Sequence, residues 1–170
     1  NAKLVLDETF GTAGLGHHSM EPRSALAYWQ NGKCYLYGST QSQSFPIPGI
    51  ARSVGVEPAD LVYVSEFCGG GFGSKGGAHP LMAIPALMSK KIGRPVMMRV
   101  SRHEEYFMGP ARAGFQGRTK MGFAADGRVT AADLYIVQES GPNRGSNDWL
   151  SAAEAVSLVY QPPAMRFRGV

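Results

Sequence analysis

The residues with the clearest chemical potential form one glycine-rich run, Cys68-Gly69-Gly70-Gly71-Phe72-Gly73-Ser74-Lys75-Gly76-Gly77. Six of the nine residues from Gly69 to Gly77 are glycine, which packs no side chain and costs backbone entropy in a helix or strand. The run therefore favours a loop whose backbone N–H groups can come close to a ligand. If a helix follows, its N-terminal donors and dipole favour an anion or an oxo group there.

One nucleotide-binding pattern fits this run. Gly71-x-Gly73-x-x-Gly76 matches the dinucleotide fingerprint and lies between an expected strand and an expected helix. The next expected strand is followed by Ser101-Arg102, where the fingerprint needs an acidic residue for the ribose. Lys75 is followed by Gly76 and not by Ser or Thr, so the Walker pattern fails. A dinucleotide-binding or non-catalytic module remains the alternative to an enzyme.

Three side chains near the N-terminus, those of His17, His18 and Glu21, resemble a set of metal ligands. His17 and Glu21 would share a face of a helix, but Gly16 and Pro22 argue against a helix there. No further ligand is close in the sequence, so we predict no metal site. We favour a role for these side chains as hydrogen-bonding groups that hold a turn in place.

Other residue patterns argue against further kinds of chemistry. Glu104 and Glu105 are adjacent and would point apart in a strand, unlike the carboxylate pair of a glycosidase. The sequence has no Gly-x-Ser-x-Gly elbow for a nucleophilic serine. Cys34 and Cys68 are too few for a zinc or iron–sulfur framework, and we expect both to be reduced thiols of a cytoplasmic protein.

Composition places the chain among folded proteins with an ordinary surface. Its 170 residues are 44% hydrophobic and 18% charged, enough for a real core. The net charge of +4 comes without a dense Lys/Arg block, so we expect no nucleic-acid partner. No stretch approaches the roughly 20 apolar residues of a membrane span, so we expect no membrane partner.

The elements that must position the glycine run follow from local patterns. We expect strands at residues 3–10, 25–29, 34–38, 61–67, 95–100, 119–124, 129–139 and 165–170, with hairpins at Asn31-Gly32 and Ala125-Asp126-Gly127. We expect helices at 45–54, at 80–91 with a kink or a late start near Ile84 because of Pro85, and at 151–160 with Ser151 as N-cap. Residues 101–107 are expected to lead into a loop. The fold class is α+β, with mixed or antiparallel sheets, hairpins and a few short helices.

Six motifs occur in an order and spacing that resemble one known family. They are His17-x-x-x-Glu21-Pro22, Ser39-Thr40-Gln41, the glycine run to Lys75, Gly93-Arg94-Pro95-Val96, Ser101-Arg102-x-Glu104-Glu105 and Tyr160-x-x-Pro163-Ala164-Met165-Arg166. The sequence resembles the molybdenum-cofactor-binding subunit of the xanthine dehydrogenase and aldehyde oxidoreductase family, the molybdenum hydroxylases. The resemblance covers residues 3–170, which we expect to form the N-terminal part of a molybdopterin-binding domain, with residues 1–2 as a remnant of an expression tag.

The resemblance implies an oxidoreductase that inserts a water-derived oxygen into a C–H bond of an aldehyde or an N-heterocycle. It implies molybdopterin, alone or as the cytosine dinucleotide, as the cofactor. Electrons would leave through iron–sulfur clusters and FAD on partner domains or subunits. The resemblance also implies that Gly70, Gly71, Phe72 and Gly73 lie against the cofactor. The backbone at Phe72 would face the oxo ligand, where free N–H donors stabilise partial negative charge, and its ring would exclude water.

Two departures from the family concern the substrate. Purine-hydroxylating members carry a Gln where this chain has Leu15, and a substrate-contacting Glu where it has Gly76. Both changes argue against a purine and favour an aldehyde or another heterocycle. Arg166 aligns loosely with an arginine that contacts substrate in the purine enzymes. The family's catalytic Glu lies in later segments, so we expect an excised fragment that is inactive alone.

Overall fold

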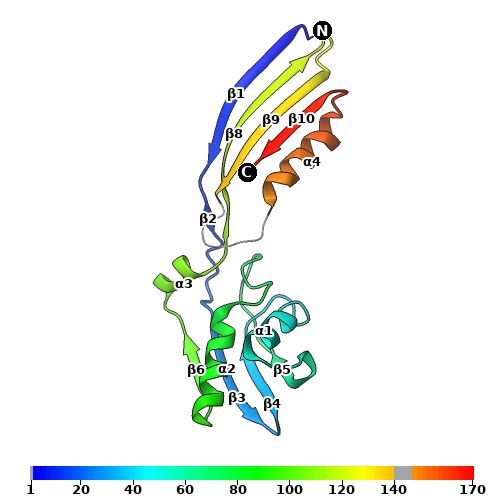
Figure 1. Cartoon of the computed structure of the whole chain (residues 1–170). Coiled ribbons are helices and arrows are strands. Elements are labelled where there is room, and N and C mark those ends of the chain that lie inside the picture. The colour runs from blue at the N-terminus through cyan, green and yellow to red at the C-terminus, as the bar shows by residue number, and fades with distance from the viewer. Residues whose placement is uncertain (1, 140–146) are drawn as a thin grey trace. The chain divides into compact units, whose positions relative to one another are not determined.

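The computed structural model describes residues 2–139 and 147–170, which fall into two compact units. The first unit comprises residues 1–15 and 111–170, and the second comprises residues 16–110. The glycine-rich run lies in the second unit. Figure 1 shows the helices and strands of each unit.

The second unit is built on a four-stranded mixed sheet in the order β5-β4-β3-β6. Its strands are β3 (Ser24–Gln30), β4 (Lys33–Gly38), β5 (Leu61–Val64) and β6 (Val96–Arg99). β3 pairs antiparallel with β4 and β6, whereas β4 pairs parallel with β5. The predicted hairpin is confirmed: Asn31 and Gly32 join β3 to β4 with φ of 52° and 79°, as a tight turn between twisted strands requires.

Two helices cover one face of this sheet, α1 (Ile47–Val54) and α2 (Pro80–Ile92) (Figure 1). A short 3-10 helix, η1 (Pro58–Asp60), leads into β5. Alternate residues of the strands meet the helices in the core, which includes Ala27, Leu36, Ile50 and Ala86. The other residues of β3 and β4 form the opposite face of the sheet, where the Tyr28 and Tyr35 rings stack at 4.9 Å.

The structure corrects three of the expected element boundaries in this unit. α2 begins at Pro80 and not near Ile84, because a proline fits the first helical position and His79 caps it by accepting a hydrogen bond from the Leu81 N–H. β5 ends at Val64, so the strand expected to reach Phe67 is shorter, and the Phe67 side chain is exposed.

The third correction is a helix that was not predicted, in the segment expected only to lead into a loop. Residues Arg102–Met108 form α3. Ser101 and Glu104 form a reciprocal capping box: the Glu104 carboxylate accepts from the Ser101 N–H at 2.6 Å, and the Ser101 hydroxyl oxygen accepts from the Glu104 N–H at 3.2 Å. This box satisfies two N–H groups that the first turn of a helix leaves free, and so it starts α3 at Arg102.

The first unit is a four-stranded sheet with one helix. The strand order is β1 (Leu4–Thr12), β8 (Gly114–Phe123), β9 (Val129–Glu139) and β10 (Met165–Gly169). β1, β8 and β9 are antiparallel, and β10 joins β9 in parallel. Two short strands, β2 (Leu15–Gly16) and β7 (Ala111–Arg112), form a separate pair.

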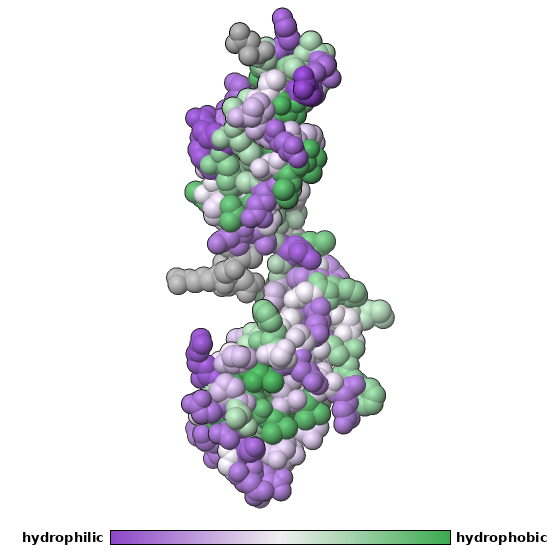
Figure 2. Space-filling model, turned by 90° about the vertical axis from the view of Figure 1, so that its right-hand side faces the viewer, coloured by the Kyte–Doolittle hydropathy of each residue, from purple (hydrophilic) through white to green (hydrophobic). Residues whose placement is uncertain are grey.

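The helix of this unit, α4 (Asp148–Tyr160), begins before the predicted N-cap, Ser151. Ser151 lies inside the helix, because Asp148, Trp149 and Leu150 already adopt helical conformation. Buried side chains of β9 lie on the α4 face of the sheet, and α4 also exposes apolar side chains such as Leu158. Figure 2 shows hydrophobic patches between hydrophilic ones on the surface of this unit.

Both units combine helices with mixed sheets, so the predicted α+β class is confirmed. No helix in the described ranges, 2–139 and 147–170, has the length and hydrophobicity needed to cross a membrane.

Candidate functional site

The candidate site is the run from Cys68 to Gly77, called the glycine loop below. It connects the segment after β5 to α2 in the second unit. All three glycines of the dinucleotide pattern precede the first residue of α2, Pro80, and residues 72–75 form a turn. The glycine loop therefore does not open a helix, in contrast to the dinucleotide fingerprint.

The centre of the glycine loop has left-handed backbone conformation. Phe72 has φ of 52° and Gly73 has φ of 103°. A left-handed conformation is uncommon for a residue as bulky as Phe, so the surroundings must hold it in place. The Phe72 side chain is 66% exposed, and its ring lies over Gly70, where a Cβ atom would come within 2.7 Å of it.

One carboxylate holds both ends of the glycine loop. The Gly69 N–H donates to Glu21 Oε2 at 2.5 Å, and Lys75 Nζ donates to Glu21 Oε1 at 2.7 Å. The Lys75 side chain is fully buried, so Glu21 supplies the negative charge that a buried ammonium needs. Burial alone raises the pKa of Glu21, but the bonds from Lys75 and Gly69 outweigh it and hold that pKa below its ordinary value.

The segment after β4 holds the second half of the loop. Gln41 Oε1 accepts hydrogen bonds from the N–H groups of Gly73, at 2.8 Å, and Lys75, at 3.2 Å. The Lys75 carbonyl oxygen accepts from the Gln41 N–H and from the Thr40 hydroxyl, both at 3.0 Å. Thr40 and Gln41 thus hold the second half of the loop through one backbone bond and three side-chain bonds.

A buried arginine links the glycine loop to α3. The Arg23 guanidinium donates to the carbonyl and the hydroxyl oxygen of Ser74 and forms an ion pair with Glu105. The Arg23 N–H also donates to Glu105 Oε2 at 2.8 Å. Arg23 and Glu105 are 3% and 7% exposed, and their charges compensate each other in the interior. Sequence reasoning missed Arg23, since nothing in its local pattern distinguishes it from a surface arginine.

Three consecutive residues at the centre of the loop keep their donors free. No residue in the described part of the chain accepts a hydrogen bond from the N–H of Gly70, Gly71 or Phe72. The N–H groups on either side, at Gly69 and Gly73, are both bonded. The side chains of Glu21 and Gln41, called the frame below, therefore leave one short stretch of unpaired backbone donors. Such donors bind anions and oxo groups in proteins.

The two histidines near Glu21 do not join it at a common centre. His17 Nδ1 lies 2.9 Å from the Pro110 carbonyl oxygen, and the His18 ring packs against Tyr106 at 5.1 Å between centroids. The His17 contact agrees with the hydrogen-bonding role that the sequence favoured, whereas His18 makes a ring contact. The described ranges hold no cluster of three or more His, Cys, Asp or Glu residues that could bind a metal ion.

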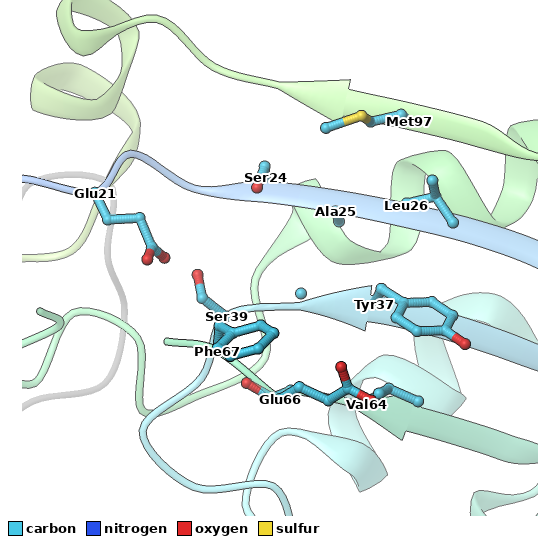
Figure 3. Close-up of a pocket in the computed structure, with 12 residues that line it drawn as sticks. Glu21, Ser24, Ala25, Leu26, Tyr37, Ser39, Val64, Glu66, Phe67 and Met97 are labelled. Atoms are coloured by element: carbon cyan, nitrogen blue, oxygen red, sulfur yellow. The ribbon is translucent and has the colours of Figure 1, made fainter. Parts of the chain in front are cut away.

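A groove of about 290 Å³ begins beside Glu21 on the open face of the sheet (Figure 3). Figure 3 shows the Glu21 carboxylate at one end and the side chains of Leu26 and Tyr37 at the other. A second carboxylate, that of Glu66, lines the groove but forms no bond to the glycine loop in the described part of the chain. Glu21 is thus the one acidic side chain that both borders the groove and holds the loop.

The three residues expected to line a substrate pocket are placed as follows. Leu15 lies in β2, is 60% exposed and belongs to the first unit, whereas Gly76 follows Lys75 in the second. A Cβ atom at Gly76 would have only an ordinary contact, 3.5 Å from the Gly73 carbonyl oxygen. Arg166 lies in β10 and forms a bidentate ion pair with Asp133, with Nε 3.0 Å from Oδ1. Arg166 therefore already has a structural partner in its own sheet.

Comparison with known families decides what kind of domain holds this loop. The family model described as the molybdopterin cofactor-binding domain matches residues 1–170. The chain belongs to this family. The resemblance found in the motifs is therefore confirmed over the whole chain.

Individual members of the family are similar to this chain at moderate identity. Aldehyde oxidoreductase from Megalodesulfovibrio gigas is 28% identical over 174 residues, which cover 99% of this chain and 19% of that protein. Membrane-bound aldehyde dehydrogenase (pyrroloquinoline-quinone) from Gluconacetobacter polyoxogenes is 30% identical over 135 residues, 78% of this chain and 17% of that protein. The chain thus spans less than a fifth of the length of either relative.

A solved structure confirms the fold. The crystal structure of quinoline 2-oxidoreductase from Pseudomonas putida 86 superposes with a TM-score of 0.88 at 24% identity, over 99% of this chain and 22% of that one. The two chains therefore share the fold of the described elements.

The glycine loop of this family member fits an oxygen-rich, anionic cofactor. Its three free N–H groups are adjacent, and the charge of the nearby Lys75 is already neutralised by Glu21. Neutral backbone donors can approach an oxo group without the desolvation cost of a second charge. Gly70, Gly71, Phe72 and Gly73, the predicted cofactor-binding residues, all lie in or next to this donor stretch.

Proposed function

We propose that this chain is part of a molybdenum-cofactor-dependent hydroxylase that oxidises an aldehyde or an N-heterocycle. The observation that carries the proposal is the stretch of free N–H groups at Gly70, Gly71 and Phe72, inside a loop whose flanks are bonded. Such donors bind oxygen ligands in a fixed geometry and need no reorganisation during a reaction. Family membership supplies the identity of the ligand, molybdopterin.

When bound, the cofactor supplies the two-electron oxidation that replaces a C–H bond by a C–O bond, with the oxygen taken from water and two protons released. The chain's own part is to bind and to shield. The N–H groups of Gly70, Gly71 and Phe72 would donate to oxygen atoms of the cofactor, and Gly73, with its positive φ, allows the turn after them. The exposed Phe72 ring covers the site and keeps bulk water away.

The substrate class follows from two side chains that are absent. Leu15 offers no hydrogen bond and Gly76 offers no carboxylate, so neither position has the polar group that the purine-hydroxylating members of the family carry there. The relatives named above are an aldehyde oxidoreductase, an aldehyde dehydrogenase and a quinoline oxidoreductase, which is consistent with an aldehyde or a heterocycle. Arg166 contributes to the pocket only if it can leave Asp133.

We propose that the electrons leave through iron–sulfur and FAD domains or subunits of the same enzyme, in the cytoplasm. The two unpaired cysteines, Cys34 and Cys68, support a reducing compartment. Residues 3–170 would form the N-terminal part of the cofactor-binding domain. Alone they would have no turnover and would bind the cofactor weakly or not at all. Stoichiometric molybdenum in the purified 170-residue chain, measured by elemental analysis, would contradict this last point.

The test of the proposal uses the full-length enzyme. We expect about one molybdenum per chain by elemental analysis, and oxidation of an aromatic aldehyde or quinoline in H₂¹⁸O with the label in the product. Xanthine should react far more slowly. A purified full-length protein without molybdenum, or a product without the label, would refute the proposal.

Dinucleotide binding is the alternative that the sequence left open. Its structural requirement, a glycine pattern that opens a helix, is not met because α2 begins at Pro80. A thermal-shift measurement with NADPH provides the test, since a large stabilisation would favour the alternative.

A further inference from the structure

Two side chains from outside the glycine loop divide it into bonded flanks and a free centre. Glu21 bonds to Gly69 at the start of the loop and to the Lys75 side chain at its end. Gln41 bonds to the N–H groups of Gly73 and Lys75. Each side chain thus accepts two hydrogen bonds, and the residues between these contacts are those with free donors.

The same two side chains occupy the space that two of the glycines leave. A Cβ atom at Gly69 would lie 2.5 Å from Glu21 Oε2 and 2.7 Å from Glu21 Cβ. A Cβ atom at Gly71 would lie 2.5 Å from Gln41 Oε1 and 2.8 Å from Gln41 Cγ. Both contacts are far shorter than real ones, and they involve the stems of the side chains as well as their tips. Gly69 and Gly71 therefore make room for the frame, which is a different reason for glycine than close approach of a ligand.

Gln41 also supports the left-handed turn, which is closed by a hydrogen bond of 2.8 Å from the Ser74 N–H to the Gly71 carbonyl oxygen. Gly73, with φ of 103°, donates to Gln41 directly after Phe72, whose φ is 52°. Without the acceptor at Gln41, nothing else in the described part of the chain holds the Gly73 N–H, and the preceding left-handed residue could relax. The direction of the free N–H groups at Gly70, Gly71 and Phe72 then depends on Gln41 and Glu21.

We infer that Glu21 and Gln41 are positioning residues, which set the rate of the proposed oxidation by fixing the free backbone donors of residues 70–72. Neither side chain needs to touch the cofactor. The inference rests on the proposed function, because the fixed donors matter for a rate only if a cofactor binds there. A purely structural role would change only the amount of cofactor that binds. The inference also predicts a change in the rate and in the spectrum of each cofactor that is bound.

The test compares variants of the full-length enzyme, with rates expressed per bound molybdenum. Gln41→Ala removes both accepted bonds, so we expect kcat per molybdenum to fall about tenfold or more with KM within about twofold. The electron paramagnetic resonance spectrum of the partly reduced molybdenum centre should change as well. Gln41→Glu keeps an oxygen that accepts both N–H groups, and should restore most of the rate. Glu66→Gln is the matched control, because this carboxylate lines the same groove without a bond to the loop.

Unchanged kcat per molybdenum and an unchanged spectrum in Gln41→Ala would overturn the inference, even if the molybdenum content fell. If Gln41→Ala does not fold, Glu21→Gln decides: its amide keeps one acceptor oxygen for two donors, so kcat per molybdenum should fall several-fold, and an unchanged value overturns the inference. Wild-type enzyme without molybdenum would instead refute the proposed function, and with it the inference.

Discussion

Glu21 and Lys75 are 54 residues apart in the sequence and form an ion pair of 2.7 Å in which the lysine side chain is fully buried. The carboxylate is 38% exposed, so the pair lies at the edge of the interior, with its cation inside. Removing one partner from such a pair is costly mainly when a buried charge is left behind. The two partners should therefore differ in what their loss does to stability.

Glu21→Ala should lower the free energy of unfolding by about 1–3 kcal/mol, because it leaves the buried Lys75 ammonium without its carboxylate. Lys75→Met should cost less, because it removes the charge and keeps much of the side-chain volume. Urea unfolding followed by the fluorescence of Trp29, in a Trp149→Phe background, measures the second unit specifically. A larger loss in Lys75→Met than in Glu21→Ala would contradict this account.

The glycines of the loop should respond differently to alanine. Gly71→Ala should destabilise by about 1–3 kcal/mol, because the new methyl group overlaps Gln41. Gly77 has no atom within 4 Å of a Cβ position, so Gly77→Ala should stay within about 0.5 kcal/mol of wild type. Gly76→Glu should also fold normally, since a Cβ atom there has only one ordinary contact. Equal losses at positions 71 and 77 in urea unfolding would exclude this explanation of the glycine pattern.

The two cysteines should differ in reactivity toward iodoacetamide. Burial raises the pKa of the Cys34 thiol to about 11, and its side chain is fully buried. Cys68 is exposed at the start of the glycine loop, and its thiol lies 3.2 Å from the Gly69 carbonyl oxygen. At pH 8 the native chain should therefore be alkylated at Cys68 within minutes and at Cys34 only after denaturation. Peptide mass spectrometry gives the site, and early labelling of Cys34 would disagree with the core described here.

Acid stability of the first unit should depend on Asp133. Hydrogen bonds from Arg166 lower the pKa of Asp133 to about 2, from an ordinary value of 3.8. Because the folded pKa is the lower one, the stabilisation is complete above pH 3.8 and is lost as the pH falls through 2. Urea unfolding followed by Trp149, in a Trp29→Phe background, should show this loss.

In Asp133→Asn the pH dependence of the free energy of unfolding between pH 4 and 2 should become weaker. An identical pH dependence in wild type and Asp133→Asn would show that the ion pair with Arg166 does not contribute.

Local signals predicted much of the fold. Asn31-Gly32 specifies a tight hairpin because both residues tolerate positive φ, and the predicted β8–β9 hairpin turns through a longer connection in which Gly127 has a φ of 85°. The helix at 102–108 was missed although Ser101 and Glu104 have the spacing of a capping box. The same rule was applied at Ser151, which lies inside α4, so the pattern alone does not distinguish a cap from a helix interior.

The sequence singled out the glycine loop of the candidate site but not the contacts that support it, and this difference has a physical reason. The glycine loop stands out locally, because composition alone shows that regular structure is unfavourable there. The roles of its supports could not be predicted: Glu21 and Gln41 lie in motifs of the sequence and Arg23 lies in none, but all three act on the loop through contacts that only the folded chain creates. The sequence explained Gly69 and Gly71 only by the close approach of a ligand. The structure adds that Glu21 and Gln41 occupy the space where their side chains would be.

The Arg23–Glu105 ion pair joins residues 82 positions apart. The Arg23 guanidinium also donates to the carbonyl oxygen of Ser74 in the glycine loop. During synthesis on the ribosome, Arg23 and the loop emerge well before Glu105, so the nascent chain cannot complete this contact until α3 has been made. The last support of the loop is consequently made after the loop itself, and we expect a short peptide of residues 68–77, which lacks all of these supports, to lose its shape. Grafting the loop onto another scaffold would require Glu21, Arg23, Gln41 and Glu105 to be transplanted with it.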